Sequence, residues 1–303
     1  MRRAWIVLAF AACLEPRLDE REQANTQQCG TQVVEGVDVY GGTGTIDWAR
    51  VKASGREFAF IKATQGTYNK QASFSTQWSG AAAAGLLRSA YHFFDGTNDG
   101  VAQANWFLAE LAAGGGMQPG DLPPLLDLEC PTSSNQATTQ SDCERAGASG
   151  WVDTPTLLAR TFDWLATVEQ ATGRKPLIYS YPSWFPDVMA SDPRLAAYPL
   201  FIATYATCAS VPPPWTSAVF WQYSASATVP GITAAADVDR FFGTHDDLVA
   251  YATPADAGVD AGEMPPMESG CGCQTRSPAG ALWLLVVLLA CITPRRLRAR
   301  FGA

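Results

Sequence analysis

Hydrophobic positions follow two alternating periods along the middle of the chain, from about residue 33 to residue 245. Short apolar runs rich in β-branched residues predict strands, and segments with apolar residues at helical spacing predict helices between them. The predicted strands are 33–40, 58–63, 87–94, 124–129, 176–181, 201–205 and 219–223. The predicted helices are 46–51, 74–84, 101–113 and 154–172, and the first of them follows Thr45 as its N-cap.

The order of these elements predicts the fold class. Repeated strand–helix units with nearly continuous apolar strands indicate a parallel sheet covered by helices. About eight strands in roughly 220 residues favour a closed barrel over an open sheet. The last strands follow one another with little helix between them. We therefore predict an α/β chain folded as an irregular (β/α) TIM-like barrel with a strand-rich C-terminal part, over residues 32–252.

The N-terminal segment has the pattern of an export signal. Arg2 and Arg3 precede an apolar run over residues 4–12, as in the basic and hydrophobic regions of a signal peptide. Cys13 follows small residues, so residues 1–13 are interpreted as a signal peptide or a lipoprotein signal, with ordinary cleavage further along as the alternative to lipidation. The polar residues 14–31 predict a tether.

The C-terminal segment predicts a linker followed by a sorting tail. Residues 253–269 are rich in Pro, Gly, Ala and acids, which is typical of a linker. Two cysteines, 14 apolar residues (279–292) and an arginine cluster follow within residues 270–303. This module resembles the MYXO-CTERM family of sorting tails, which implies processing at the cysteines. An apolar stretch this short falls below the roughly 20 residues of a spanning helix, but a single-pass anchor remains the alternative.

These two segments together predict an exported protein. We expect it at the cell surface or outer envelope, or secreted after processing, with transient or permanent membrane association through the tail.

The charge of the chain narrows the choice of partners. Its 303 residues contain 29 acidic and 21 basic side chains, and all 29 acids but only 14 bases lie within residues 13–270. A body this acidic is repelled by phosphate backbones, so we expect no nucleic-acid partner. The chain has two histidines and lacks the H-E-x-x-H, G-x-S-x-G and P-loop motifs. Zincin, α/β-hydrolase and P-loop chemistry are therefore excluded, and no metal is expected.

Carboxylates gather where the predicted strands end. Asp38 lies near the end of the first strand, Asp127 and Glu129 end the fourth, and Asp237 follows the last apolar strands. The carboxyl ends of barrel strands form one working face, so these groups are expected to meet. Asp127 and Glu129 share a strand face about 6.6 Å apart. Such a pair supplies the acid and the anion that cleave a glycosidic bond, although a solvated Asp-x-Glu loop is the alternative.

Six short segments then occur in order along the chain, at residues 36–40, 44–48, 60–64, 90–93, 126–129 and 221–224. They resemble the successive motifs of family 25 glycoside hydrolases. The resemblance implies an irregular β/α barrel with N-acetylmuramidase (lysozyme) activity on the β-1,4 bond between N-acetylmuramic acid and N-acetylglucosamine, without a cofactor. Peptidoglycan glycan strands are then the expected partner of a monomeric enzyme. A catalytically silent peptidoglycan-binding or adhesion module on the same barrel is the alternative.

The resemblance also implies roles for the four carboxylates. Glu129 matches the general acid/base, Asp127 its partner carboxylate, Asp38 the first-strand aspartate and Asp237 the aspartate after the Trp-Gln-Tyr strand. Direct attack by Asp127 and attack by the substrate's own N-acetyl oxygen both remain open.

Two positions depart from the family pattern. Gln65 stands where the family usually has Glu, and Asp239 where it usually has Asn. These departures put the charge of the cleft rim and the preferred substrate in question, whereas the four carboxylates are retained.

Aromatic residues near the predicted strand ends are candidates for a wall on which sugars stack. The candidate substrate-binding residues are Tyr40, Tyr91, His92, Tyr179, Tyr205, Trp221 and Tyr223. Strand alternation sends either Tyr91 or His92 outward, and a structural role is the alternative for His92 and for the Trp221–Tyr223 pair. Trp48 is expected in the core, and Lys62 either pairs with a cleft carboxylate or extends to solvent.

Four cysteines of the barrel region are expected to be oxidised after export. We favour pairing Cys130 with Cys143 and Cys29 with Cys208, and a Cys130–Cys208 pairing is the alternative.

Overall fold

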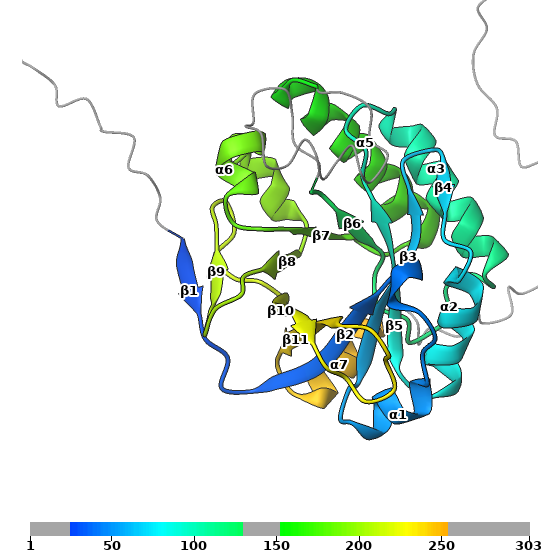
Figure 1. Ribbon diagram of the computed structural model, residues 1–303. Helices are drawn as coiled ribbons and strands as arrows, with labels where there is room; N and C mark the ends of the chain where they lie inside the picture. Colours follow the sequence, from blue (N-terminus) through cyan, green and yellow to red (C-terminus); the bar gives the residue numbers. More distant parts are fainter. Residues whose placement is uncertain (1–24, 130–151, 254–303) are drawn as a thin grey trace, which may run out of the picture. The chain divides into compact units, whose positions relative to one another are not determined.

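Eight strands close into a barrel in the computed structural model, which describes residues 25–129 and 152–253 (Figure 1). The pairing of β2 with both β3 and β11 completes the circle. The barrel strands are β2 (Val33–Val39), β3 (Phe58–Gln65), β5 (Leu87–Phe93), β6 (Leu125–Asp127), β7 (Leu177–Ser180), β8 (Leu200–Ala203), β10 (Phe220–Ala227) and β11 (Ala236–Phe242). The predicted irregular α/β barrel is confirmed.

The barrel is irregular because β11 runs against both of its neighbours. From β2 through β3, β5, β6, β7 and β8 to β10 every pairing is parallel, whereas β11 pairs antiparallel with β10 and with β2. The pattern of strand–helix units predicted a parallel sheet, and β11 departs from it because the described residues 228–235 place no helix between it and β10. Its reversed direction brings the start of β11, not its end, to the end of the barrel where the parallel strands finish.

Three short strands of the described residues lie outside the barrel circuit. The strand β4 (Asn69–Lys70) forms a hairpin with β3, while β1 (Thr26–Gln28) pairs with β9 (Ala209–Val211). A disulfide joins Cys29 to Cys208 directly beside the β1–β9 pair, with a Cα–Cα distance of 4.6 Å. This predicted pairing is confirmed, and it excludes the Cys130–Cys208 alternative. The predicted partners Cys130 and Cys143 lie outside the described residues.

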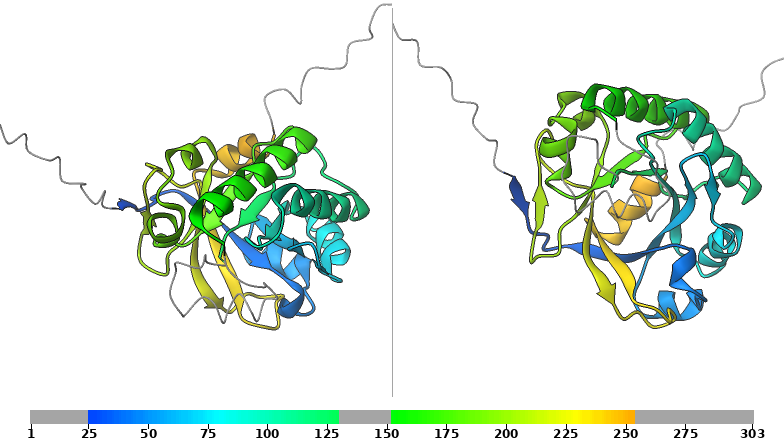
Figure 2. Two further views of the ribbon diagram at one scale, coloured as in Figure 1. Left: turned by 90° about the horizontal axis from the view of Figure 1, so that it is seen from above. Right: turned by 45° about the horizontal axis from the view of Figure 1, so that its top comes forward.

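Apart from the last helix, which lies across one end of the barrel, the helices lie around the outside of the barrel wall, as the views of Figure 2 show. They are α1 (Trp48–Ala53), α2 (Phe74–Ala83), α3 (Gly100–Ala113), α5 (Thr154–Thr172), α6 (Trp184–Met189) and α7 (His245–Ala252), with 3-10 turns η1 (Gly41–Thr43) and η2 (Pro193–Ala197). The first helix begins later than predicted, because its N-cap is Asp47, whose side chain accepts a hydrogen bond from Arg50 N at 3.1 Å, and not Thr45. Trp48 is buried at its first turn, as predicted.

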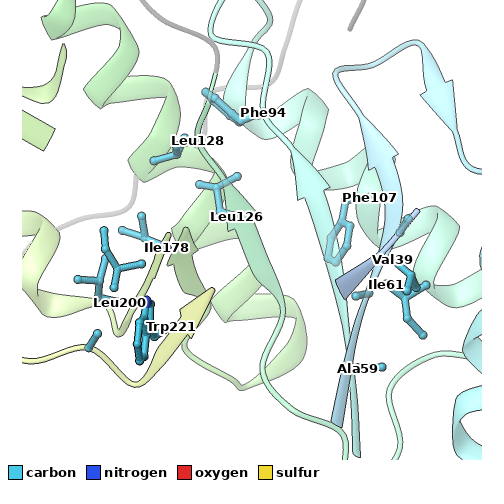
Figure 3. Packing of buried hydrophobic residues seen from close by; sticks show 14 of the residues in the cluster. Val39, Ala59, Ile61, Phe94, Phe107, Leu126, Leu128, Ile178, Leu200 and Trp221 are labelled. Atoms are coloured by element: carbon cyan, nitrogen blue, oxygen red, sulfur yellow. The ribbon is translucent and has the colours of Figure 1, made fainter. Parts of the chain in front are cut away.

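Alternation along each strand separates two apolar layers. Residues that point outward, such as Ile61, Leu126 and Ile178, belong to a cluster that also contains Phe107 of the covering helix α3 (Figure 3). Residues that point inward form a second cluster filled by the rings of Phe58, Phe60, Phe201 and Phe220. Both faces of most strands are therefore apolar, which is typical of a barrel wall buried on both sides.

The inner aromatic cluster fills the lower part of the barrel. Helix α7 covers it where the parallel strands begin, and the Tyr251 ring of α7 lies 5.9 Å from that of Phe220. The barrel is thus plugged by apolar side chains at this end.

Four of the predicted segments fall wholly or mostly on other parts of the chain. The export signal, most of the polar tether and nearly all of the linker and sorting tail lie outside the described residues. Within residues 25–129 and 152–253, no helix is both long and apolar enough to cross a membrane.

Candidate active site

A cavity of about 190 Å³ opens where the parallel strands of the barrel end. Four carboxylates that the sequence predicted to meet all line it: Asp38, Asp127, Glu129 and Asp237. The other lining residues are Tyr40, Lys62, Tyr91, Phe93, Leu125, Tyr179, Phe201 and Gln222.

Each carboxylate reaches the cavity through its place in the barrel. Asp38 is the last but one residue of β2, and Asp127 ends β6, with Glu129 two residues further on. Asp237 lies at the start of β11, directly paired with Asp38. The sequence placed Asp237 beyond the last strand, but the antiparallel direction of β11 is what brings it to this end of the barrel.

Asp38 is held by Gln222 from the opposite side of β11. The Gln222 Nε2 atom donates a hydrogen bond of 2.8 Å to Asp38 Oδ2. Burial raises the pKa of Asp38 well above its ordinary value, and the charge of Asp237 raises it further, while the bond from Gln222 lowers it. Burial also raises the pKa of Asp237. The two paired carboxyls therefore retain protons more readily than exposed aspartates do.

Asp127 sits between a carboxyl and a cation. Burial raises its pKa well above the ordinary value and Glu129 adds to this rise, whereas Lys62 opposes it. Burial lowers the pKa of Lys62 in turn, against the charges of Asp127, Glu129 and Asp38. Lys62 Nζ donates to Gln65 Oε1 at 3.1 Å and lies 4.3 Å from the centre of the Phe93 ring. The position that departs from the family pattern, Gln65, is thus a neutral acceptor that positions this lysine.

Two of the predicted tyrosines orient Gln222. The hydroxyls of Tyr179 and Tyr205 donate to Gln222 Oε1 at 3.0 and 2.8 Å. The oxygen of the amide therefore faces the tyrosines, and its nitrogen faces Asp38. Tyr91 lines the floor of the cavity, and Tyr40, 50% exposed, lines its rim. These four tyrosines lie at or next to the cavity, as the strand ends predicted.

Three other candidates point away from the cavity. His92 is buried outside the barrel wall, where Nδ1 contacts Thr64 Oγ1 at 2.7 Å and Nε2 contacts Gln103 Oε1 at 3.1 Å. Its ring stacks on Trp164 at 5.7 Å, and burial lowers its pKa to about 3. The expectation that His92 binds substrate is corrected accordingly, because alternation turns Tyr91 inward and His92 outward.

Trp221 and Tyr223 also face outward, on either side of the inward residue Gln222. Trp221 Nε1 donates to Thr204 O at 2.7 Å. The Tyr223 hydroxyl donates to Glu35 Oε2 at 2.6 Å, and Arg240 lies 4.0 Å from the Tyr223 ring centre. The structure therefore gives no support to a sugar-stacking wall made by this pair. Sequence reasoning instead overlooked Gln222, whose position between them on the strand was the available signal.

The cavity brings together groups that can carry out glycoside hydrolysis. A carboxyl that keeps its proton can protonate a leaving glycosidic oxygen, and a nearby anion can stabilise the positive charge that develops on the sugar. Among the described residues, no group of three or more His, Cys, Asp or Glu side chains is arranged to hold a metal ion.

Residues 37–232 match the family model described as glycosyl hydrolases family 25. The chain belongs to this family. Lysozyme M1 from Streptomyces globisporus is 34% identical over 230 residues, which are 73% of this chain and 72% of that protein. An N,O-diacetylmuramidase from a Chalaropsis species is 32% identical over 205 residues, or 63% of this chain and 88% of that protein.

The fold agrees with this assignment. The crystal structure of a lysozyme from Streptomyces coelicolor has a TM-score of 0.63 and 32% identity, covering 73% of this chain and 98% of the other. This family 25 chain is accordingly a glycoside hydrolase of the lysozyme and muramidase type. Asp237 and Asp239 lie just beyond the matched residues, so their places are known from the barrel geometry.

Proposed function

We propose that this enzyme hydrolyses the β-1,4 bond between N-acetylmuramic acid and N-acetylglucosamine in peptidoglycan. One observation carries the proposal: Asp127 and Glu129 line the same cavity beside the half-buried cation Lys62. Relatives named as a lysozyme and as an N,O-diacetylmuramidase support a cell-wall glycan as the substrate.

In this mechanism Glu129 is the general acid. This role is the one that the family resemblance implies for Glu129. Lys62 faces both carboxyls and opposes the rise in the pKa of Asp127, so it lowers the cost of a negative charge there. Glu129 gives that proton to the glycosidic oxygen as the bond to the anomeric carbon breaks. It then takes a proton from the water that completes hydrolysis.

The anion near the anomeric carbon is Asp127. It either attacks this carbon directly, or orients the N-acetyl group so that the substrate's own oxygen attacks. A covalent glycosyl adduct on Asp127, trapped with a slow substrate and located by mass spectrometry, would identify the first route. Asp38 and Asp237 stabilise the site from the other side of the cavity.

Loss of turbidity of a purified cell-wall suspension tests the activity, with Glu129→Gln as the inactive control. Mass spectrometry of the released fragments identifies the bond that is cut. Binding to cell walls without release of fragments would instead favour the silent binding module.

We further propose that the enzyme is exported as a monomer and held at the cell surface or released. The support is the signal-like start and the tail that resembles sorting tails. We expect the mature chain to end near Cys271 or Cys273. Intact-mass analysis of the protein from its native cells tests this, and a species that retains residues 295–303 would indicate a permanent membrane anchor. Light scattering of the purified protein tests the monomer.

A further inference from the structure

One carboxyl inside the barrel has no role in the mechanism above. Asp239 lies on β11, two residues after Asp237, and its side chain is fully buried (0% exposed). Neither Oδ1 nor Oδ2 has a hydrogen-bond partner among the donors of the described residues. A buried carboxylate without a donor is costly, because burial removes water and nothing replaces it.

The surroundings of Asp239 explain which way its carboxyl turns. On the neighbouring strand β2 it is paired with Gly36, which has no side chain. The Phe58 ring occupies the space beside Gly36, since a Cβ added to Gly36 would lie 2.2 Å from that ring. On the other side it is paired with Gln222, whose amide nitrogen is bound to Asp38. The carboxyl of Asp38, which accepts the bond from that amide, also lies close enough to Asp239 to raise its pKa.

Two carboxyls in contact form a hydrogen bond only if one of them is protonated. We propose that Asp239 is a positioning residue: it stays a neutral acid and donates its proton to Asp38 from below the cavity. Asp38 is then held by two donors, the Gln222 amide from one side and the Asp239 hydroxyl from the other. The inference rests on the proposed function for its activity measurements.

The charges that face Asp239 favour this neutral form. Asp38 and Glu35 of β2 and Asp237 of β11 all carry the same sign as an ionised Asp239, and Tyr205 lies near enough to be affected by it. Burial raises the pKa of Asp239 well above its ordinary value, and the charges of Asp38 and Asp237 raise it further. Ionisation of Asp239 would break the bond to Asp38 and add a negative charge beneath the cavity.

Two substitutions separate the proton from the shape of the side chain. Asp239→Asn keeps a donor that cannot ionise, whereas Asp239→Leu has the same number of side-chain heavy atoms in the same branched arrangement and no donor. We expect Asp239→Asn to keep most of the wall-lysing activity and to extend it to higher pH than the wild type. We expect Asp239→Leu to lose about tenfold or more, as for loss of one hydrogen bond to a charged group, at every pH.

Two measurements report on the proton without depending on activity. At neutral pH the infrared difference spectrum between the wild type and Asp239→Asn should contain a band of a protonated carboxylic acid. Asp239→Asn should also gain thermal stability over the wild type as the pH rises above about 4. Above this pH the unfolded wild type releases the Asp239 proton more readily than the folded protein does, so the wild type loses stability, whereas the variant has no proton to release.

Three results would overturn the inference. They are the absence of the infrared band, wall-lysing activity of Asp239→Leu equal to that of the wild type at every pH, and loss of activity of Asp239→Asn at the same alkaline pH as the wild type. If the wild type itself lyses no cell wall, the proposed function fails. The infrared and stability measurements then decide the protonation of Asp239 on their own.

Discussion

Gln222 Nε2 lies 2.8 Å from Oδ2 of Asp38, across the strand β11 that separates their own strands in the barrel. The direction of this bond is set at the other end of the amide, where Tyr179 and Tyr205 both donate to Oε1. An amide is required at this position because a carboxyl would offer Asp38 an acceptor instead of a donor.

We therefore expect Gln222→Glu to lower kcat by about tenfold or more at neutral pH, through loss of a hydrogen bond to a charged group. Activity should partly return as the pH is lowered, since the introduced carboxyl again offers a donor once it is protonated; kcat measured from acid to neutral pH checks this. Tyr205→Phe is the matched control, because it removes one donor to Oε1 and leaves the bond to Asp38. Equal pH profiles for Gln222→Glu and the control would contradict the prediction.

The general acid is tested by Glu129→Gln. The amide is nearly isosteric but supplies no proton, so the rate should fall on the order of 10²–10⁴ while the fold is kept. Thermal unfolding and wall lysis of the same preparation give both quantities. Asp237→Asn should be less damaging, because Asp237 lies across the cavity beside Asp38. An equal loss in both variants would make Asp237 a direct participant.

Among the described residues that line the cavity, Lys62 is the cation. Its charge opposes the rise in the pKa of Asp127 that burial causes. Lys62→Met should therefore raise the pKa of Asp127 and move the acid limb of kcat/KM to higher pH. Lys62→Arg keeps the charge and should move this limb much less. A limb that stays in place in Lys62→Met would show that Asp127 does not titrate in this range.

His92 predicts an acid-sensitive part of the stability. Burial lowers its pKa to about 3 from an ordinary value of 6.5, so between these values the unfolded chain binds a proton that the folded chain does not. Its contribution to the free energy of unfolding is complete above pH 6.5 and falls as the pH drops, by about 5 kcal/mol near pH 3.

The carboxyls with raised pKa values stabilise the fold as the pH falls, which opposes the effect of His92. The contribution of His92 is therefore measured against a variant that has no titrating group at this position. His92→Asn keeps a polar atom near Nδ1 for Thr64 and carries no titrating proton. Chemical denaturation of both proteins from pH 7 to pH 4 should narrow the stability difference between them as the pH falls. A constant difference would mean that His92 takes up a proton as readily in the folded protein as in the unfolded chain.

The sequence predicted the barrel because its strands and helices alternate with clear periods. It predicted the carboxylate pair because Asp127 and Glu129 directly follow a buried strand. Spacing alone was enough for these features, since each depends on residues close together in the chain.

The sequence could not tell which face of β10 points into the barrel. Outward Trp221 packs under the covering elements and inward Phe220 packs in the aromatic cluster, so both faces are apolar. The polarity of the residues therefore does not tell which face of β10 points into the barrel. The sequence accordingly indicated the aromatic neighbours of Gln222 as candidates and not Gln222 itself. The reversed direction of β11 was equally hidden, because a hairpin and a crossover differ in the path of the chain and not in the pattern of the strand.

The disulfide between Cys29 and Cys208 closes a covalent ring that contains β2 to β8 and the carboxylates Asp38, Asp127 and Glu129. A protease that cuts the backbone once between residues 30 and 207 would leave both fragments bonded to each other. Such a nicked enzyme would migrate as one species without reductant and as two with it. In an environment rich in proteases, the first cut within this ring would thus release no part of the active site.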